Sequence, residues 1–280
     1  MRTKLTFSTI VLIVVIVVVI ALLLFRSRAG TSKSQTPTEI TNVVLPINQR
    51  PYFTITSAKS PINGSFDGKF YLLSISNAPA DTSVDYELAY ETSTVPRGTV
   101  GSATFSNGKY EREDFFGTKS TKDYHFDTGV EFGKTTLTVK SSTNEYEIEA
   151  DFRLQKIGPA KTLLSDRNNT FELQIPAGAV SKSAAIISQR TVGLPQIYSS
   201  KFLLDQPISF LTQATTTLAK SAVLKIKVDK NSSGKVVIVG WDGKGATWRE
   251  FETTFDPQTE IAQANVDLLS TYIVVEKLGI

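Results

Sequence analysis

The sequence contains no cysteine, one histidine at position 125, and methionine only at position 1. Without cysteine the chain has no disulfide, no thiolate metal site, no cysteine nucleophile and no acceptor for lipoprotein acylation. Any Ser-His-Asp triad or histidine-containing metal site would have to include His125. We therefore expect the fold to depend on the burial of apolar side chains, because no covalent or metal crosslink is available.

A strong net charge is also missing from the part of the chain that we expect to fold. The formal charge is +3, but five basic residues lie beside the hydrophobic segment at residues 7–25. The remainder has 25 basic and 27 acidic residues, a net charge of −2. Because no cluster of lysine and arginine remains there, we expect no nucleic-acid partner.

Residues 7–25 form a long apolar run without charge, glycine or proline. As a helix the run would span about 28 Å, the thickness of the hydrocarbon core of a bilayer. The sequence thus predicts a transmembrane signal anchor in contact with the lipid bilayer, a cytoplasmic head at 1–6 and a polar tether at 26–49. Basic residues are nearly balanced on the two sides of the segment, so charge does not decide its orientation. The head at 1–6 is too short to fold as a domain, which favours placing the larger C-terminal part outside the cell membrane. Cleavage after Ala29 is the open alternative.

Alternation of apolar and polar residues dominates the rest of the chain. Residues 83–91 and 145–154 each place apolar side chains on one face and charged side chains on the other, the pattern of half-buried strands. Further strands are expected at short intervals, separated by turn pairs such as Asn107-Gly108. The predicted fold class is mainly β, with one N-terminal transmembrane helix followed by two β-sandwich domains.

The first predicted domain covers residues 50–156 and the second covers 160–280, with Ile157-Gly158-Pro159 as a short break between them. About seven short strands in the first region are typical of a sandwich. That region resembles immunoglobulin-like and fibronectin type III-like sandwiches, although it carries no motif specific to one family.

The second region has a more distinctive string, Phe171-Glu-Leu-Gln-Ile-Pro-Ala-Gly-Ala-Val180. Later features follow in order: Gln206-Pro-Ile-Ser-Phe210, a hairpin from Trp241 to Trp248, and the closing strand Leu269-Ser-Thr-Tyr-Ile-Val-Val275. Residues 162–276 thereby resemble ZU5-like β-sandwich domains. The resemblance implies a sandwich fold and an interaction module without catalysis.

Two segments suggest catalysis, each with a simpler structural interpretation. Asp127-Thr128-Gly129 matches the tripeptide of aspartic proteases, but a second copy is absent, so a homodimer would be needed. A tight turn between two strands explains the same residues. His125 lies between two aromatic residues that we expect in the core, so we expect it on a solvated face.

Two other segments suggest ligand binding. The loop from Asp229 to Gly234 begins with the oxygen spacing of an EF-hand, but the twelfth position is Gly240 instead of a carboxylate. We expect an ordinary hairpin loop there, while weak calcium binding at the Asp229 loop stays open. Trp241 and Trp248 could stack on sugars, but Trp241 shares a strand face with Val237 and Val239, which predicts burial.

Taken together, these patterns assign no catalytic, cofactor-binding or metal-binding residue. We expect a non-enzymatic binding or structural module at the cell surface, with an unknown protein or glycan as its partner. Two alternatives stay open. One is a cell-envelope hydrolase that uses carboxylates such as Asp127 on wall polymer or protein, and the other is a passive subunit of an envelope assembly.

Overall fold

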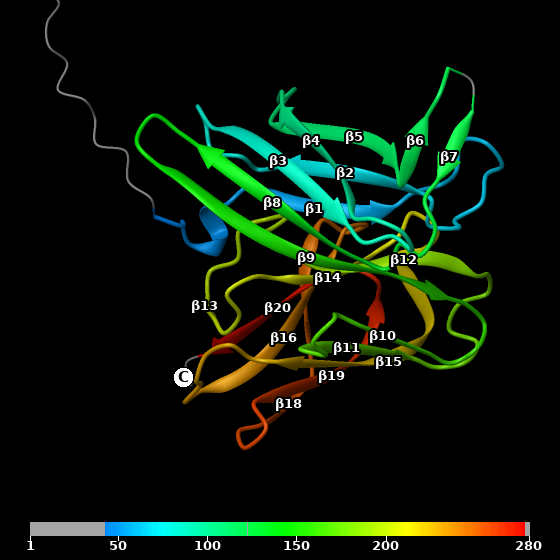
Figure 1. Ribbon diagram of the computed structural model, residues 1–280. Coiled ribbons are helices and arrows are strands. Elements are labelled where there is room, and N and C mark those ends of the chain that lie inside the picture. Colours follow the sequence, from blue (N-terminus) through cyan, green and yellow to red (C-terminus); the bar gives the residue numbers. More distant parts are fainter. Residues whose placement is uncertain (1–42, 122, 278–280) are drawn as a thin grey trace, which may run out of the picture. The chain divides into compact units, whose positions relative to one another are not determined.

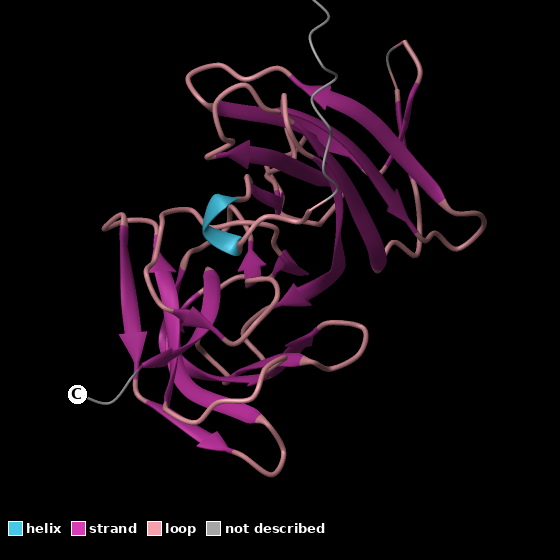
Figure 2. Ribbon diagram, turned by 90° about the vertical axis from the view of Figure 1, so that its left-hand side faces the viewer, coloured by secondary structure: helices cyan, strands magenta, loops and turns pink. Residues whose placement is uncertain are grey.

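A computed structural model describes residues 43–121 and 123–277 (Figure 1). This part is mainly β, as predicted, and its one helical segment is the short 3-10 turn η1 (Ile47–Gln49) (Figure 2). The predicted transmembrane helix at 7–25 and most of the tether lie outside the described residues. Among the residues that are described, no helix is long and apolar enough to cross a membrane.

Nine strands precede the predicted break at residues 157–159. They are β1 (Tyr52–Ser57), β2 (Phe70–Ser76), β3 (Ser83–Tyr90), β4 (Arg97–Ala103), β5 (Lys109–Phe115), β6 (Gly117–Lys119), β7 (Tyr124–Phe126), β8 (Phe132–Lys140) and β9 (Glu145–Ile157). The alternating segments expected at 83–91 and 145–154 are confirmed as β3 and β9. The turn expected at Asn107-Gly108 is also present, because both residues have positive φ and Ser106 pairs with Lys109 across it.

Eleven strands follow the break. They are β10 (Thr162–Ser165), β11 (Phe171–Ile175), β12 (Ala184–Arg190), β13 (Lys201–Phe202), β14 (Ile208–Leu211), β15 (Thr217–Lys227), β16 (Lys235–Asp242), β17 (Thr247–Phe251), β18 (Thr253–Asp256), β19 (Ile261–Leu268) and β20 (Thr271–Lys277). The segment from 201 to 211 divides into β13 and β14, because Pro207 in the connecting segment has no N–H to donate to a ladder.

A ten-stranded sheet contains strands from both sides of the predicted break, in the order β17-β16-β20-β14-β12-β9-β8-β3-β4, with β13 paired to β20. β9 pairs with β12 in antiparallel register from Ile157 opposite Ala184 to Phe152 opposite Gln189. The hydrogen-bonded ladder therefore joins a strand that precedes the predicted break to one that follows it. The division into two separate domains stays a prediction.

Two smaller sheets cover the ten-stranded sheet. The sheet β1-β2-β5 packs over β3, β8 and β9 and encloses a core that includes Phe53, Leu73 and Leu137. The sheet β10-β11-β15-β19-β18 packs over β12, β14, β16 and β20 and encloses a second core that includes Phe171 and Phe210. The packing is sandwich-like in both places.

Strand β12 contributes to both cores. Ile187 belongs to the first core, whereas its neighbour Ile186 and Ala184 belong to the second. Successive side chains of a strand point to opposite faces of the sheet, so the two cores lie against opposite faces of the ten-stranded sheet at β12. This explains why six of the seven residues of β12 are buried instead of only alternate ones.

Candidate functional site

Asp127 follows β7, and its carboxylate is engaged in a structural network. The Oδ1 atom lies 3.1 Å from the Nε atom of Arg97, and Oδ2 accepts a hydrogen bond of 2.9 Å from the hydroxyl of Tyr90. The side chain of Asp127 is only 12% exposed. Neither partner is a carboxylate, so these contacts do not form the proton-sharing pair that an aspartic protease requires.

The same contacts change the chemistry of Tyr90. Burial raises the pKa of the Tyr90 hydroxyl, and the adjacent carboxylate of Asp127 raises it further. Tyr90 therefore remains a neutral hydrogen-bond donor at physiological pH. Gly129 has a φ of +73° and closes the turn after Asp127, which agrees with the turn expected for Asp127-Thr128-Gly129.

His125 is exposed, as predicted, at the centre of the short strand β7. Its neighbours Tyr124 and Phe126 are half-buried and stack with ring centroids 5.8 Å apart. Both rings also contact Phe70. The two aromatic side chains hold β7 against the body of the sheet, and the imidazole of His125 faces away from them.

The Asp229 loop connects β15 and β16, but these strands belong to different sheets and do not pair, so the expected hairpin loop is wrong and the loop is a connection between two sheets. One oxygen of the Asp229 carboxylate accepts hydrogen bonds from the guanidinium of Arg190 at 3.3 Å and from the backbone N–H of Asp205 at 3.0 Å. The Asp205 carboxylate lies 2.9 Å from the Nζ atom of Lys230. Both carboxylates thus have a basic partner, Arg190 for Asp229 and Lys230 for Asp205.

Across residues 43–121 and 123–277, no group of three or more His, Cys, Asp or Glu side chains is arranged to hold a metal ion. The acidic residues of β5 that could be imagined as a carboxylate pair lie beside cations instead. Glu111 lies 2.7 Å from Lys109, and Asp114 lies 2.7 Å from Arg112.

Trp241 and Trp248 face each other across the β16–β17 hairpin, with ring centroids 5.3 Å apart in an edge-to-face arrangement. Both rings are half-buried, so the burial expected for Trp241 is only partial. Trp248 also contacts Tyr198 and donates its indole N–H to the carbonyl of Gln196. The pair thus joins the hairpin to the segment that precedes β13.

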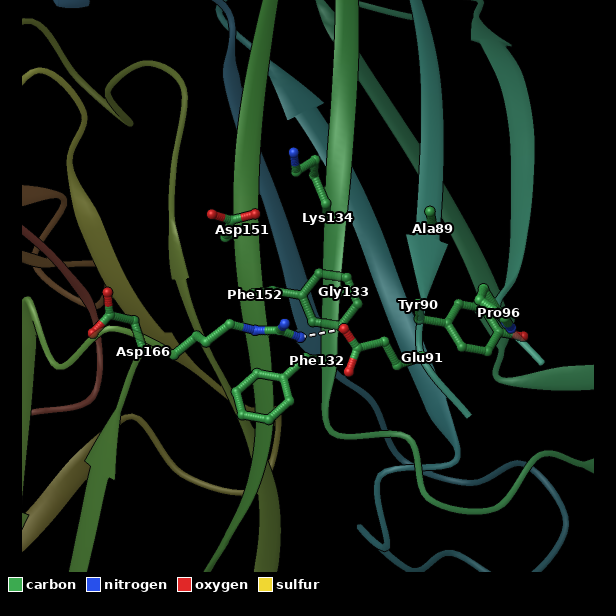
Figure 3. Close-up of a pocket in the computed structure, with 11 residues that line it drawn as sticks. Ala89, Tyr90, Glu91, Pro96, Phe132, Gly133, Lys134, Asp151, Phe152 and Asp166 are labelled. Atoms are coloured by element: carbon green, nitrogen blue, oxygen red, sulfur yellow. Dashed lines mark hydrogen bonds and ion pairs between the residues drawn. The ribbon is translucent and has the colours of Figure 1, made fainter. Parts of the chain in front are cut away.

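An open cleft of about 370 Å³ lies on the outer face of the ten-stranded sheet (Figure 3). The ring of Phe132 lies between two guanidinium groups, with Arg153 at 4.9 Å and Arg167 at 4.3 Å from its centroid. Arg167 also forms an ion pair with Glu91, and Arg153 forms one with Glu131 at 2.6 Å. Cation–π and ionic contacts of this kind hold the wall of the cleft in one arrangement.

Sequence patterns could not identify this cleft, because its residues come from four segments. Glu91 follows β3, Phe132 begins β8, Arg153 lies in β9, and Arg167 lies in the loop between β10 and β11. Only Phe132 gives a signal in the sequence: it is an aromatic residue at a position where the alternation of β8 places polar side chains. The pairing of β8 with β9 sets it opposite Arg153.

Comparison with known proteins gives no relative: no family model matches the chain, and no curated protein matches it. The resemblances to ZU5-like and to immunoglobulin-like or fibronectin-like domains therefore stay predictions.

Proposed function

We propose that this protein is a non-catalytic binding or structural module, held on the outer side of the cell membrane by residues 7–25. In this proposal residues 50–156 form an immunoglobulin-like or fibronectin-like sandwich, and residues 160–280 form a ZU5-like sandwich. Binding surfaces on the rigid sheets, such as the Phe132 cleft, would contact a protein or glycan.

The observation that carries the proposal is the environment of Asp127. Its carboxylate is paired with Arg97 and accepts the Tyr90 hydrogen bond, so it serves packing between β3, β4 and the segment after β7. A hydrolase would need a carboxylate with a raised pKa or a partner carboxylate beside it. The alternative of a carboxylate-based envelope hydrolase draws no support from this position.

Proximity labelling on intact cells tests the proposal. A peroxidase fused after Ile280 should biotinylate extracellular proteins with a membrane-impermeant substrate, and the labelled set should contain a binding partner. The control carries Ile16→Arg and Val17→Arg, since each arginine near the centre of a transmembrane helix costs about 2.5–3.5 kcal/mol of insertion.

In the control, surface labelling should be lost. If the fusion of the unaltered chain labelled only cytoplasmic proteins, the proposed location would be wrong. If the purified chain cleaved wall polymer or peptide, and Asp127→Asn abolished that cleavage, the hydrolase would be the correct function and the binding module would be wrong.

A further inference from the structure

Strand β4 is an open edge of the ten-stranded sheet. It pairs with β3 over its whole length, from Arg97 opposite Tyr90 to Ala103 opposite Val84. Within the described chain, no other strand pairs with β4, and no loop forms a backbone hydrogen bond to it. Alternate residues of such a strand direct their N–H and C=O groups away from the sheet, where a further strand could pair with them.

The other edge strands are short, charged or, in β1, already hydrogen-bonded to a side chain; shortness and charge are two common protections against strand addition. β1 has six residues and no charge, but the side chain of Gln189 accepts a hydrogen bond from the N–H of Ile55 and donates one to the carbonyl of Ile55. β10 and β18 have four residues each, and β17 has five residues that include Arg249 and Glu250. β5 has seven residues, of which five are charged: Lys109, Glu111, Arg112, Glu113 and Asp114. β4 also has seven residues, but its sole charged residue is Arg97 at the start. β4 is thus a long edge strand that neither length nor charge protects.

An acidic groove of about 370 Å³ lies beside this edge on the outer face of the sheet. Its lining includes Val100 of β4, Glu87 of β3, Thr136 of β8 and Glu147 of β9. Val100 is 71% exposed and is the most exposed large apolar side chain reported for the described residues. It stands at the rim of the groove, in the middle of the open strand.

Charge in and around the groove favours one kind of occupant. Strand pairing places six carboxylates and two lysines on this part of the outer face, which gives it a net charge of −4. These residues are Asp85, Glu87, Glu145, Glu147, Glu149, Asp151, Lys134 and Lys140. Asp85, Glu145 and Glu149 form ion pairs with the lysines. The Glu87 side chain is exposed, and its carboxylate forms no hydrogen bond or ion pair with another described residue. Its carboxylate is available to a cation.

We propose that β4 binds an extended peptide segment of a partner protein that carries lysine or arginine at alternate positions. The segment would add as an eleventh strand, about 4.8 Å from β4 and therefore about 10 Å from β3. A lysine on its outer side would extend over Val100 toward Glu87. Main-chain hydrogen bonds would supply affinity, and the acidic groove would select the basic side chains.

This inference rests on the proposed binding function and names the chemistry of the partner. Small side chains along β4 permit close approach of another backbone, since Gly98, Thr99 and Ser102 leave little bulk beside the edge. A second copy of the chain is a different occupant. It would bring two acidic faces next to each other, so charge disfavours it.

Fluorescence anisotropy with the full-length chain in a nonionic detergent tests the proposal. The probe is a labelled, end-capped peptide of four Lys-Val repeats, and the charge control is the matching Glu-Val peptide. We expect the Lys-Val peptide to bind and to weaken as salt rises, and the Glu-Val peptide not to bind.

Backbone pairing is tested with two N-methylated forms of the Lys-Val peptide. One is methylated at the lysine amides and the other at the valine amides. In an added strand only one of these two sets points toward β4, so one form should lose at least about tenfold in affinity and the other should bind normally. Equal effects of the two forms would overturn strand addition.

Point variants locate the site. Val100→Lys should reduce Lys-Val peptide binding at least about tenfold, because it places a positive charge on the edge. Ile197→Lys is the matched control, since Ile197 is 69% exposed and lies outside β4. Glu87→Gln should weaken binding about fivefold, and Glu147→Gln should weaken it less, because β8 separates β9 from β3.

Three further results would overturn the proposal. The first is no binding of the Lys-Val peptide, and the second is binding that Val100→Lys leaves unchanged. The third is a dimer of the full-length chain in light scattering that Val100→Lys converts to a monomer, because β4 would then pair with a second copy. Each of these failures concerns β4 alone, whereas surface labelling of partners tests the general binding function independently.

Discussion

At the scale of single residues, Asp127 stabilises the fold through Tyr90 and Arg97. We expect Asp127→Ala to lower the free energy of unfolding by about 1–3 kcal/mol, because the buried Tyr90 hydroxyl would lose its acceptor. Urea denaturation measures this change. A double-mutant cycle with Tyr90→Phe should give a coupling energy of about 1 kcal/mol. If Asp127→Ala left stability unchanged, its carboxylate would not have the structural role that we infer.

Glu276 gives a prediction for acid stability. Hydrogen bonding to Lys201, together with the N–H and hydroxyl of Ser233, lowers the pKa of this carboxyl to about 2 from an ordinary 4.5. The ionised carboxylate therefore stabilises the folded state fully above pH 4.5, and this stabilisation is lost as the pH falls from 4.5 toward 2.

We expect Glu276→Gln to reduce stability at pH 7 and to flatten the dependence of stability on pH between 4.5 and 2. Urea midpoints measured at several pH values check this expectation. Glu252→Gln is a suitable control, because Glu252 is exposed and has no partner in the described part of the chain. An acid profile of Glu276→Gln that is parallel to that of the unaltered chain would contradict the role of Glu276.

At the scale of elements, the β16–β17 hairpin depends on its tryptophan pair. Trp241→Ala removes the edge-to-face contact with Trp248, which we expect to cost about 1–2 kcal/mol of unfolding free energy and to reduce the near-UV circular dichroism of the tryptophans. Trp241→Phe should restore most of the stability. If Trp241→Ala instead abolished binding to soluble glycans and left stability unchanged, the Trp241 ring would serve to stack on sugars.

Elements with strict alternation were the most predictable. β3 and β9 alternate cleanly in sequence because one face of each is solvated, and both lie within two or three residues of the expected bounds. The pairing of β12 with β9 was not predicted, because a strand with apolar residues on both faces does not indicate which core each face meets. β17 and β18 are separated by one residue but belong to different sheets, a division that alternation in the sequence does not indicate.

At the scale of the whole molecule, the continuous ladder between β9 and β12 couples the two cores. We expect a single cooperative unfolding transition in urea for the two predicted sandwich regions. Fluorescence of Trp241 and Trp248 reports on the second region, and hydrogen exchange of β2 and β3 reports on the first.

Ile187 tests this coupling, since it is fully buried in the first core but belongs to β12 of the second region. Ile187→Ala should cost about 2–5 kcal/mol and should shift both probes equally. Two separate transitions, or a shift confined to one probe, would show that the regions unfold as independent domains. Ile238→Ala, buried in the second core, is the matched comparison.

The sequence by itself determined the β class, the places of most strands and turns, the exposure of His125 and the loop at Asp229. These features depend on local alternation and on turn residues, which neighbours in sequence specify. The partners of Asp127, the Phe132 cleft, the sharing of β12 between two cores and the open edge at β4 were decided only by the tertiary structure. Each of them joins residues that are far apart in the chain, and strand order fixes which of those residues meet.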